Sequence, residues 1–76
     1  MFVYILYSSS LGCYYTGQTQ DVDERIIRHN SGRVNSTKSG CPWSIVKVID
    51  VTSRSEAVII ERKIKKRGSK RFLEED

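Results

Sequence analysis

The chain has 76 residues, and a chain of this length buries only about 60% of its unfolded surface, so its core is thin. Thirteen basic and nine acidic residues leave a net charge of +4, which favours a polyanionic partner. No apolar run of about 18 residues occurs, which excludes a membrane-spanning helix, and the first residues lack the pattern of a signal peptide.

The first half of the chain predicts a β-hairpin followed by a helix. Residues 2–7 are almost all apolar or aromatic, which is typical of a strand buried on both faces. A serine-rich turn leads into a second strand over residues 13–19, whose aromatic and β-branched side chains favour that conformation. Asp21 and Glu24 form a capping-box pattern, so a helix is expected over about residues 22–30.

The second half predicts a loop, a strand and a long helix. Residues 32–42 contain hardly an apolar side chain, which indicates a loop long enough to be functional or mobile. Residues 43–51 alternate partly between apolar and polar side chains and predict a third strand. Ser53 and Glu56 form a second capping box, and the helix that they start should end at Gly68.

A last short helix is expected to close the chain. Ser69 is a candidate cap for it, and Phe72 and Leu73 should dock on the core. The predicted order is β-β-α-β-α-α, a three-stranded antiparallel sheet flanked by helices, within the α/β (α+β) class rather than a Rossmann unit. No repeat or linker interrupts this order, so residues 1–76 are expected to form a single domain.

The cysteines and the basic residues bear on compartment and partner. Cys13 and Cys41 lie far apart outside any CxxC pattern, which predicts reduced thiols, no disulfide, no zinc site and a cytoplasmic protein. Basic residues crowd the C-terminal third: Arg62, Lys63, Lys65, Lys66, Arg67, Lys70 and Arg71. Two readings stay open for this cluster, a solvated helix face or a contact surface for a polyanion.

Helical spacing brings the charged candidates to the edge of the core. Arg25 and His29 are four residues apart, so they project from one face of the first helix. Glu61 is four residues from Ala57 and three from Ile64, which places it on or beside the buried stripe of the long helix. A carboxylate there requires compensation, either a salt bridge to Arg25 or a lysine, or a metal ion.

The aromatic residues of the hairpin allow an ordinary and a functional interpretation. Tyr4 and Tyr15 fit a strand, where each could be a core residue with one solvated hydroxyl. Gly17 is less usual inside a strand, and it indicates either a β-bulge or a close approach of a ligand.

In chain order the candidates form a pattern. It runs through Phe2-Val3-Tyr4, Tyr15-Thr16-Gly17, Arg25, His29, Pro42-Trp43 and Glu61. This arrangement resembles the GIY-YIG endonucleases over nearly the whole chain. It is especially similar to their small stand-alone bacterial members and to the nuclease subunit of structure-specific endonucleases.

The resemblance implies a site that hydrolyses phosphodiester bonds. Glu61 would hold one divalent ion, Mg²⁺ or Mn²⁺. Tyr15 would act as the general base or relay for the attacking water, with Tyr4 assisting it. Arg25 would clamp the phosphate, for which a guanidinium fork is well shaped. His29 would orient water or share in proton transfer.

The resemblance also implies the substrate and its contacts. DNA would be the partner, cut in repair or recombination, with Gly17, Gln18, Lys38 and Lys65 binding it. Gln18 stands where some members carry lysine. A second protein would supply target choice, because the chain shows no separate targeting domain. Two alternatives stay open: a nucleic-acid-binding module with little or no catalysis, and an interaction subunit with exposed apolar surface around Phe72 and Leu73.

Overall fold

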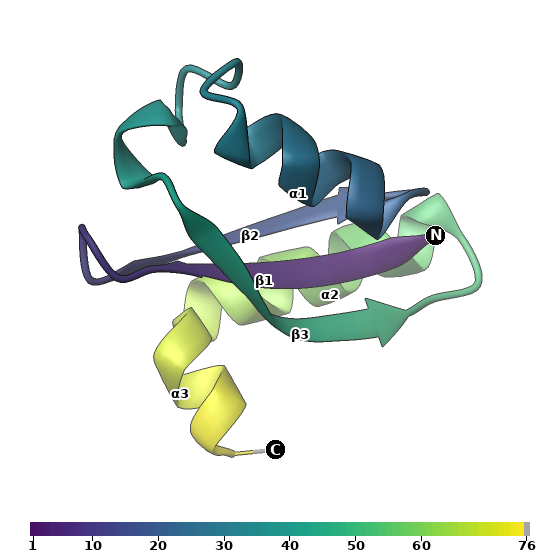
Figure 1. The fold of residues 1–76 in the computed structure, drawn as a ribbon. Helices are drawn as coiled ribbons and strands as arrows, with labels where there is room; N and C mark the ends of the chain where they lie inside the picture. The colour runs from purple at the N-terminus through teal and green to yellow at the C-terminus, as the bar shows by residue number, and fades with distance from the viewer. Residues whose placement is uncertain (76) are drawn as a thin grey trace.

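The computed structural model describes residues 1–75, and its elements follow the predicted order (Figure 1). They are β1 (Phe2–Ser8), β2 (Cys13–Thr19), α1 (Val22–Asn30), the 3-10 turn η1 (Lys38–Gly40), β3 (Trp43–Asp50), α2 (Arg54–Arg67) and α3 (Ser69–Glu74). The predicted α+β class and the order β-β-α-β-α-α are confirmed.

The sheet has the strand order β2-β1-β3, and both pairings are antiparallel. The central strand β1 is the one whose sequence is almost wholly apolar, and Val3, Tyr4, Ile5 and Leu6 are all fully buried. The prediction of a strand buried on both faces is therefore confirmed. Both outer strands are sheet edges, so β2 has one side that no other strand of the described chain covers.

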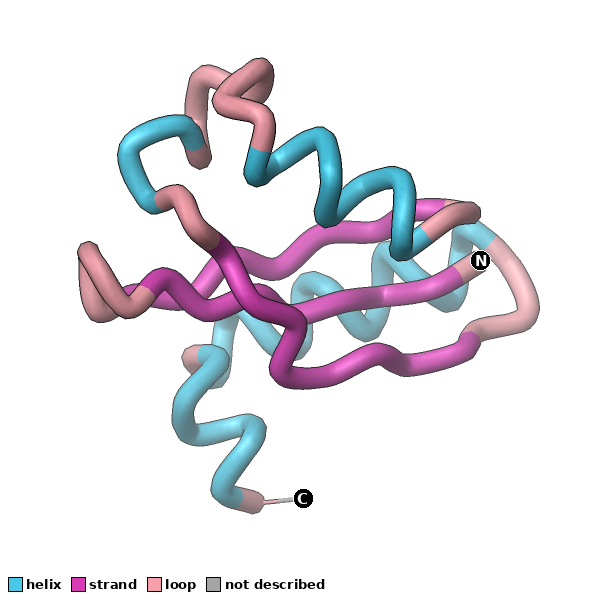
Figure 2. Tube along the Cα trace, in the orientation of Figure 1, coloured by secondary structure: helices cyan, strands magenta, loops and turns pink. Residues whose placement is uncertain are grey.

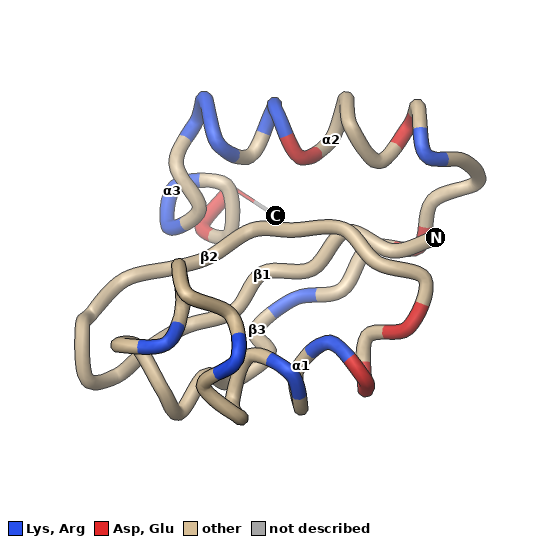
Figure 3. The backbone as a smooth tube through the Cα atoms, turned by 90° about the horizontal axis from the view of Figure 1, so that it is seen from above, with Lys and Arg blue, Asp and Glu red and all other residues tan. Residues whose placement is uncertain are grey.

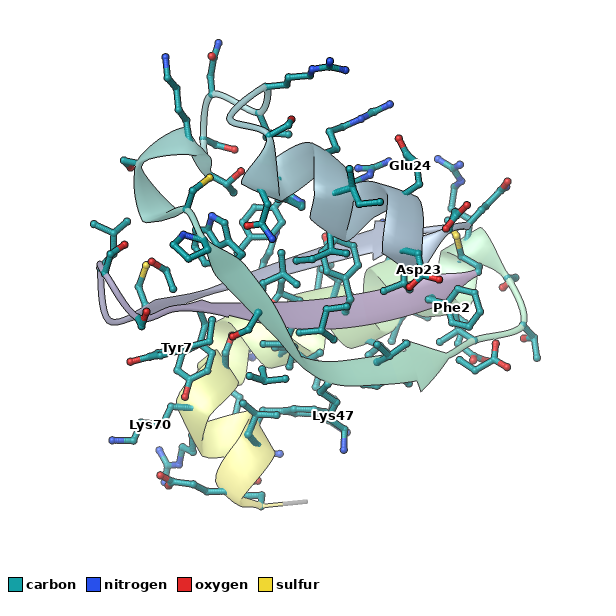
Figure 4. All side chains as sticks on the ribbon, in the orientation of Figure 1. Phe2, Tyr7, Asp23, Glu24, Lys47 and Lys70 are labelled. Atoms are coloured by element: carbon teal, nitrogen blue, oxygen red, sulfur yellow. The ribbon has the colours of Figure 1, made fainter. Side chains whose placement is uncertain are left out.

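Helices cover the two faces of the sheet and create two cores (Figures 1 and 2). Alternate side chains of β1 point to opposite faces. Val3 and Ile5 join an apolar core under α2 and α3, whereas Tyr4 and Leu6 join Trp43 in a more aromatic core under α1. In Figure 4, Tyr7 and Lys47 lie on the α3 side of the sheet, while Glu24 stands on the outer side of α1.

The first helix begins at the predicted cap. Asp21 accepts a hydrogen bond from the backbone N–H of Glu24 at 3.0 Å. The side chain of Glu24 pairs with Arg28 at 3.0 Å instead of returning to the cap. Only one of the two hydrogen bonds of the predicted capping box at the start of α1 is therefore formed.

The second helix also begins as expected, with one shift. Ser53 accepts from the N–H of Glu56 at 3.2 Å, as a capping residue does. The Glu56 carboxylate accepts in turn from the backbone N–H of Thr52 at 3.3 Å, one residue before the cap. Gly68, with φ of 93°, ends α2 where the sequence predicts the stop.

The predicted capping role of Ser69 is wrong. Ser69 is the first residue of α3, and Gly68 occupies the cap position without a side-chain bond. The Ser69 hydroxyl instead lies 3.1 Å from that of Thr16, which ties α3 to β2. Phe72 and Leu73 pack against the α2-side core, as predicted, and each is half-buried.

The segment from residue 32 to residue 42 is more ordered than a plain loop. It contains η1, and Thr37 and Gly40 within it are buried. Cys13 and Cys41 are both free thiols. Within residues 1–75, no helix is long and apolar enough to cross a membrane.

Candidate active site

A chain of buried hydrogen bonds runs from β1 through α1 to the 32–42 segment. The Tyr4 hydroxyl lies 3.0 Å from Nε2 of His29, and Nδ1 of His29 lies 2.8 Å from Oγ1 of Thr37. All three residues are about 1% exposed. The imidazole predicted at the edge of the core is thus inside it, with a partner for each ring nitrogen.

The surroundings of Thr37 indicate which nitrogen of His29 carries the hydrogen. The Thr37 hydroxyl donates to the carbonyl of Val34 at 3.4 Å, which leaves its oxygen to accept from Nδ1–H of His29. Nε2 of the neutral ring then accepts from the Tyr4 hydroxyl, so we assign this tautomer. The Tyr4 oxygen keeps lone pairs that face Arg25.

Burial shifts the ionisation of both partners toward their neutral forms. Burial, together with the neighbouring Tyr15, raises the pKa of Tyr4 to about 12, although Arg25 opposes the shift through its charge and a hydrogen bond. The charge of Glu61 adds to the rise. Burial lowers the pKa of His29 below its ordinary 6.5, and the charges of Arg25 and Arg28 lower it further.

Tyr15 lies beside this chain on the same face of the sheet. Its ring centroid is 4.9 Å from that of His29 and 6.3 Å from that of Trp43. Tyr15 is half-buried, whereas Tyr4 is almost wholly enclosed. Of the two tyrosines, Tyr15 is therefore the better placed to meet a ligand.

Trp43 holds the cluster from the β3 side. Its indole N–H donates to the carbonyl of Thr37 at 2.7 Å. The side chain of Asn30 makes two bonds to the backbone of Trp43: Nδ2 donates to the carbonyl at 3.0 Å, and Oδ1 accepts from the N–H. A Cβ on Gly40 would come within 2.3 Å of the indole, so only glycine leaves room for this packing. The ring of Trp43 thus fixes the position of Thr37 under His29.

Gly17 does not lie at a bulge, and the structure gives it a packing role beside Tyr4. The β1–β2 register passes through the Tyr4–Gly17 pair without a shift, so the predicted bulge is wrong at this position. A Cβ on Gly17 would lie 2.6 Å from the Tyr4 hydroxyl, so the close neighbour is a side chain of the same protein. The bulge lies in the β1–β3 pairing instead, where Ile5 faces Lys47 and Leu6 faces Ile45.

Arg25 and Gln18 border a groove at the end of β2, near the starts of α1 and α2. The groove is lined by Met1, Gln18, Thr19, Gln20, Asp21, Glu24, Arg25 and Arg54. Two atoms of these residues, Nε of Arg25 and Oε1 of Gln18, are buried without a hydrogen-bond partner among the described residues. A buried donor and acceptor left open at a groove suit a polar ligand that supplies both partners.

Glu61 approaches from the other helix. Its side chain is 19% exposed and pairs with Lys65 at 3.5 Å, one of the salt bridges that the sequence allows. Its charge acts on the pKa of Tyr4, as does that of Arg25. Carboxylate and guanidinium, from helices on opposite faces of the sheet, therefore both act on the same phenol.

The family-model match covers residues 1–73 and is described as the GIY-YIG catalytic domain. The chain belongs to the GIY-YIG family. A UPF0213 protein of Staphylococcus epidermidis is 40% identical over 65 residues, covering 84% of this chain and 78% of that protein. UPF0213 proteins of Halalkalibacterium halodurans and Halobacterium salinarum are each 38% identical, covering 84% and 83% of this chain and 68% and 82% of their own lengths. No solved structure matches the chain.

The sequence-predicted residues of this GIY-YIG domain divide into three groups. Tyr4, Tyr15 and His29 are in one cluster. Arg25 and Glu61 both act on that cluster through Tyr4. Lys38 lies apart, exposed at the start of η1 with its stem beside Gly32, and the substrate roles of Gly17, Gln18, Lys38 and Lys65 stay predictions.

Supporting roles for Thr37 and Asn30 were not predicted, and Trp43 was predicted only as a landmark of the family pattern. Thr37, Trp43 and Asn30 orient His29 and one another, and their spacing in the sequence follows no periodic pattern. The available signal was chemical. A histidine on the inner face of a helix needs a partner for each ring nitrogen, and a threonine in an otherwise polar loop is a natural candidate.

GIY-YIG membership implies a divalent ion, and the donor set decides which kind fits. Among residues 1–75, no group of three or more His, Cys, Asp and Glu side chains is arranged to hold a metal. Glu61 alone does not suit a protein-only cage such as a structural zinc site. It does suit Mg²⁺, which keeps several waters and takes one or two carboxylates, with substrate phosphate as a further ligand.

The stability of this GIY-YIG domain is expected to fall as the pH drops below about 6.5. The pKa of His29 is lower in the folded chain than its ordinary 6.5, so the unfolded chain takes up the proton first. The stabilisation is complete above about pH 6.5 and is lost at about 1.4 kcal/mol per pH unit until the folded pKa is reached. Urea unfolding at several pH values measures this slope.

His29→Gln is the matched variant, because His29 is the only histidine in the chain. Its free energy of unfolding should change less over the same pH interval than that of the parent. Equal slopes for the two proteins would show that His29 is not the group that titrates.

Proposed function

We propose that this GIY-YIG domain is a divalent-metal-dependent endonuclease that hydrolyses phosphodiester bonds in DNA. The observation that carries the proposal is the convergence on Tyr4. Its hydroxyl is bonded to His29, and its ionisation responds to both Arg25 and Glu61. A cation for phosphate, a carboxylate for a metal and an ordered pair of phenols are the groups that such a hydrolysis uses.

In this proposal Arg25 binds the scissile phosphate. The guanidinium lies at the groove at the end of β2, and its Nε has no partner among the described residues. A phosphate oxygen would satisfy that donor, and the fork geometry would fix the phosphorus relative to Tyr15. The unpaired Oε1 of Gln18 in the same groove would accept from a donor group of the nucleotide.

Tyr15 accepts the proton of the attacking water. It is the half-buried tyrosine of the cluster, so its hydroxyl can meet a ligand that the enclosed Tyr4 cannot reach. Tyr15 passes its own hydroxyl proton to solvent as it takes that of the water, and the water oxygen forms a bond to phosphorus. The bond to the leaving oxygen breaks, this oxygen takes up a proton from solvent, and the strand is cut. The positive charge of Arg25 favours this step because charge builds up on the phosphate oxygens.

Tyr4, His29 and Thr37 act as a positioning unit behind Tyr15. Neutral His29 holds the Tyr4 hydroxyl by accepting its hydrogen, and Thr37 holds the imidazole from the other side. The Tyr4 oxygen is thereby presented to Arg25. A rigid unit of this kind keeps the guanidinium at the groove without a conformational search.

Glu61 would hold the divalent ion. When bound, the ion supplies positive charge against the scissile phosphate and its leaving oxygen. Lys65, the present partner of Glu61, is 60% exposed, and such exposed pairs are weak and readily opened.

The substrate class that we propose is branched or damaged DNA, cut during repair or recombination, in the cytoplasm. This part of the proposal rests on the family and on the site. A partner protein that supplies target choice belongs to the same proposal.

Glu61→Gln tests the proposal. The parent is incubated with branched and with plain duplex DNA in the presence of Mg²⁺ or Mn²⁺, and the products are resolved on a gel. Cleavage by the parent should fall about 10²–10³-fold in the variant, because the amide neither holds the ion nor carries charge. Glu74→Gln, the same substitution at an exposed residue of α3, is the matched control. Cleavage that survives in Glu61→Gln would refute the assigned role.

A second candidate function is nucleic-acid binding with little or no catalysis. The observation that favours it is the near-complete burial of Tyr4 and His29, which suits two core residues as well as a positioning unit. Binding without any cleavage by the parent, under the conditions just given, would establish this candidate instead.

A further inference from the structure

A strongly basic cleft lies between α2 and α3, away from the groove at Arg25. It has a volume of about 500 Å³ and is lined by Lys63, Lys66, Arg67, Arg71 and Glu75. Four cations thus surround one carboxylate. Figure 3 shows basic residues gathered along the second half of α2 and on α3.

The carboxylate of Glu75 is held by two arginines from different helices. Nη1 of Arg67 lies 3.0 Å from Oε2 of Glu75, and Nε of Arg71 lies 3.5 Å from Oε1. Guanidinium groups bind carboxylate and phosphate oxygens with the same paired geometry. The Glu75 carboxylate therefore marks a place where these two side chains can hold a phosphate group.

The two arginines are presented by a fixed frame. The N–H of Gly68 donates to the carbonyl of Ile64 at 2.8 Å, and the N–H of Phe72 donates to the carbonyl of Gly68 at 2.9 Å. Phe72 also packs on the core, and Ser69 is bonded to β2. The turn between α2 and α3 is thus anchored on both sides, which sets the spacing of Arg67 and Arg71.

Glu75 itself is a weak occupant of this place. The side chains of Glu75, Arg67 and Arg71 are 42%, 47% and 78% exposed. Exposed ion pairs contribute little and are screened by salt. A polyanion that brings several phosphates to the cleft at once can displace a single carboxylate.

The cleft faces a different direction from the candidate active site. Successive residues of an α-helix are rotated by about 100°, so Lys63, two residues after Glu61, points to nearly the opposite side of α2. Arg67 lies on the Lys63 flank, whereas Lys65 shares the flank of Glu61 and pairs with it. A nucleic acid held at Arg25 and Glu61 would therefore reach the cleft only with a second segment.

We infer that the α2–α3 cleft is a second binding site for a nucleic-acid phosphate backbone, in which Glu75 occupies the phosphate position until the nucleic acid displaces it. The inference rests on the proposed function for its ligand class alone and does not require hydrolysis. Two backbone sites on opposite flanks of one helix suit a substrate whose segments diverge, as the arms of a branched duplex do.

The test is equilibrium binding of a fluorescent duplex, followed by anisotropy in EDTA over about 50–300 mM NaCl. The double variant Arg67→Gln/Arg71→Gln should raise Kd about tenfold or more at the low-salt end and reduce the salt slope by about 1–2. The control, Arg28→Gln/Arg33→Gln, removes the same charge from two exposed positions, one on α1 and one in the loop that follows it. It should change Kd less than about threefold.

Glu75→Gln is expected to have the opposite effect, tighter binding of the duplex, which an unfolded variant would not show. Removing the competing carboxylate should lower Kd about three- to tenfold. Glu74→Gln removes the same charge at the neighbouring position, where no pair of arginines among residues 1–75 holds the carboxylate, and should have a clearly smaller effect. Equal effects of these two variants, or of the two arginine pairs, would overturn the inference.

Binding of the parent protein to vesicles of phosphatidylserine and phosphatidylcholine is measured as a further comparison. Tighter binding of the parent to these vesicles than to the duplex would assign the cleft to a membrane surface and also overturn the inference. Because binding is measured without metal, its result is independent of cleavage. If binding depends on the arginines of the α2–α3 cleft but no DNA is cut, only the nuclease proposal is refuted. If DNA is cut but binding does not depend on those arginines, only the inference about the cleft is refuted.

Discussion

Replacing Tyr15 by phenylalanine is expected to lower the rate of DNA cleavage about 10²–10⁴-fold, the range for loss of a general base. The change removes one oxygen atom and leaves the ring in place against His29 and Trp43, at centroid distances of 4.9 Å and 6.3 Å. Since the ring supplies the packing, the free energy of unfolding should stay nearly the same. Single-turnover cleavage at saturating metal measures the effect on the chemical step.

Tyr14→Phe is the matched control for this prediction. Tyr14 is the preceding residue on β2, so its side chain points to the opposite face of the sheet, where its ring centroid lies 4.9 Å from that of Tyr7. The same atom is removed one residue away, and cleavage should change less than about twofold, as for substitutions that touch no functional group. If Tyr15→Phe cut DNA as fast as Tyr14→Phe does, Tyr15 would not be the acceptor of the proton from the attacking water.

Replacing Trp43 by alanine is expected to destabilise the protein by about 3–5 kcal/mol, the usual cost of removing a large buried aromatic residue. Trp43 is 6% exposed and packs with Tyr4 and Leu6 in the α1-side core. A domain of this size has a total stability of only about 4–11 kcal/mol, so the variant should be close to unfolding. Circular dichroism during urea unfolding measures the loss, because the chain has no other tryptophan for fluorescence.

Trp43→Phe separates packing from hydrogen bonding. It keeps an aromatic ring in the core and removes the N–H that donates to the carbonyl of Thr37 at 2.7 Å. The Thr37 carbonyl still accepts from the N–H of Gly40 at 3.1 Å, so the loss of the indole bond should cost only about 0.5–1.5 kcal/mol, less than the alanine variant loses. Equal stability of parent and alanine variant would mean that Trp43 does not support the α1-side core.

Much of the fold could be predicted because local signals agree with one another. The apolar run of residues 2–7 indicated a central strand, and β1 is that strand. Asp21 and Ser53 indicated the helix starts, and each accepts the N–H three residues on. Capping depends on neighbours in sequence, which is why these predictions were confirmed while the cap assigned to Ser69 was wrong: its hydroxyl lies beside that of Thr16, 53 residues away.

The β-bulge between β1 and β3 could likewise not be located from neighbouring residues alone. Residues 43–51 alternate only partly, and the reason is the register shift that pairs Leu6 with Ile45 and Ile5 with Lys47. The sequence showed an irregularity, yet it did not show which strand contained it. The sequence indicated Gly17 as a possible bulge, whereas in the structure Gly17 leaves space for the Tyr4 hydroxyl.

By itself, the sequence determined the elements, their order, the family and the helix faces that carry Arg25, His29 and Glu61, because each depends on residues a few positions apart. Only the tertiary structure decided the partners of those residues. Tyr4 meets His29 across 25 positions, and Thr37 completes the chain. The pKa of Tyr4 rises and that of His29 falls mainly through burial, and burial is a property of the packed sheet and helices together.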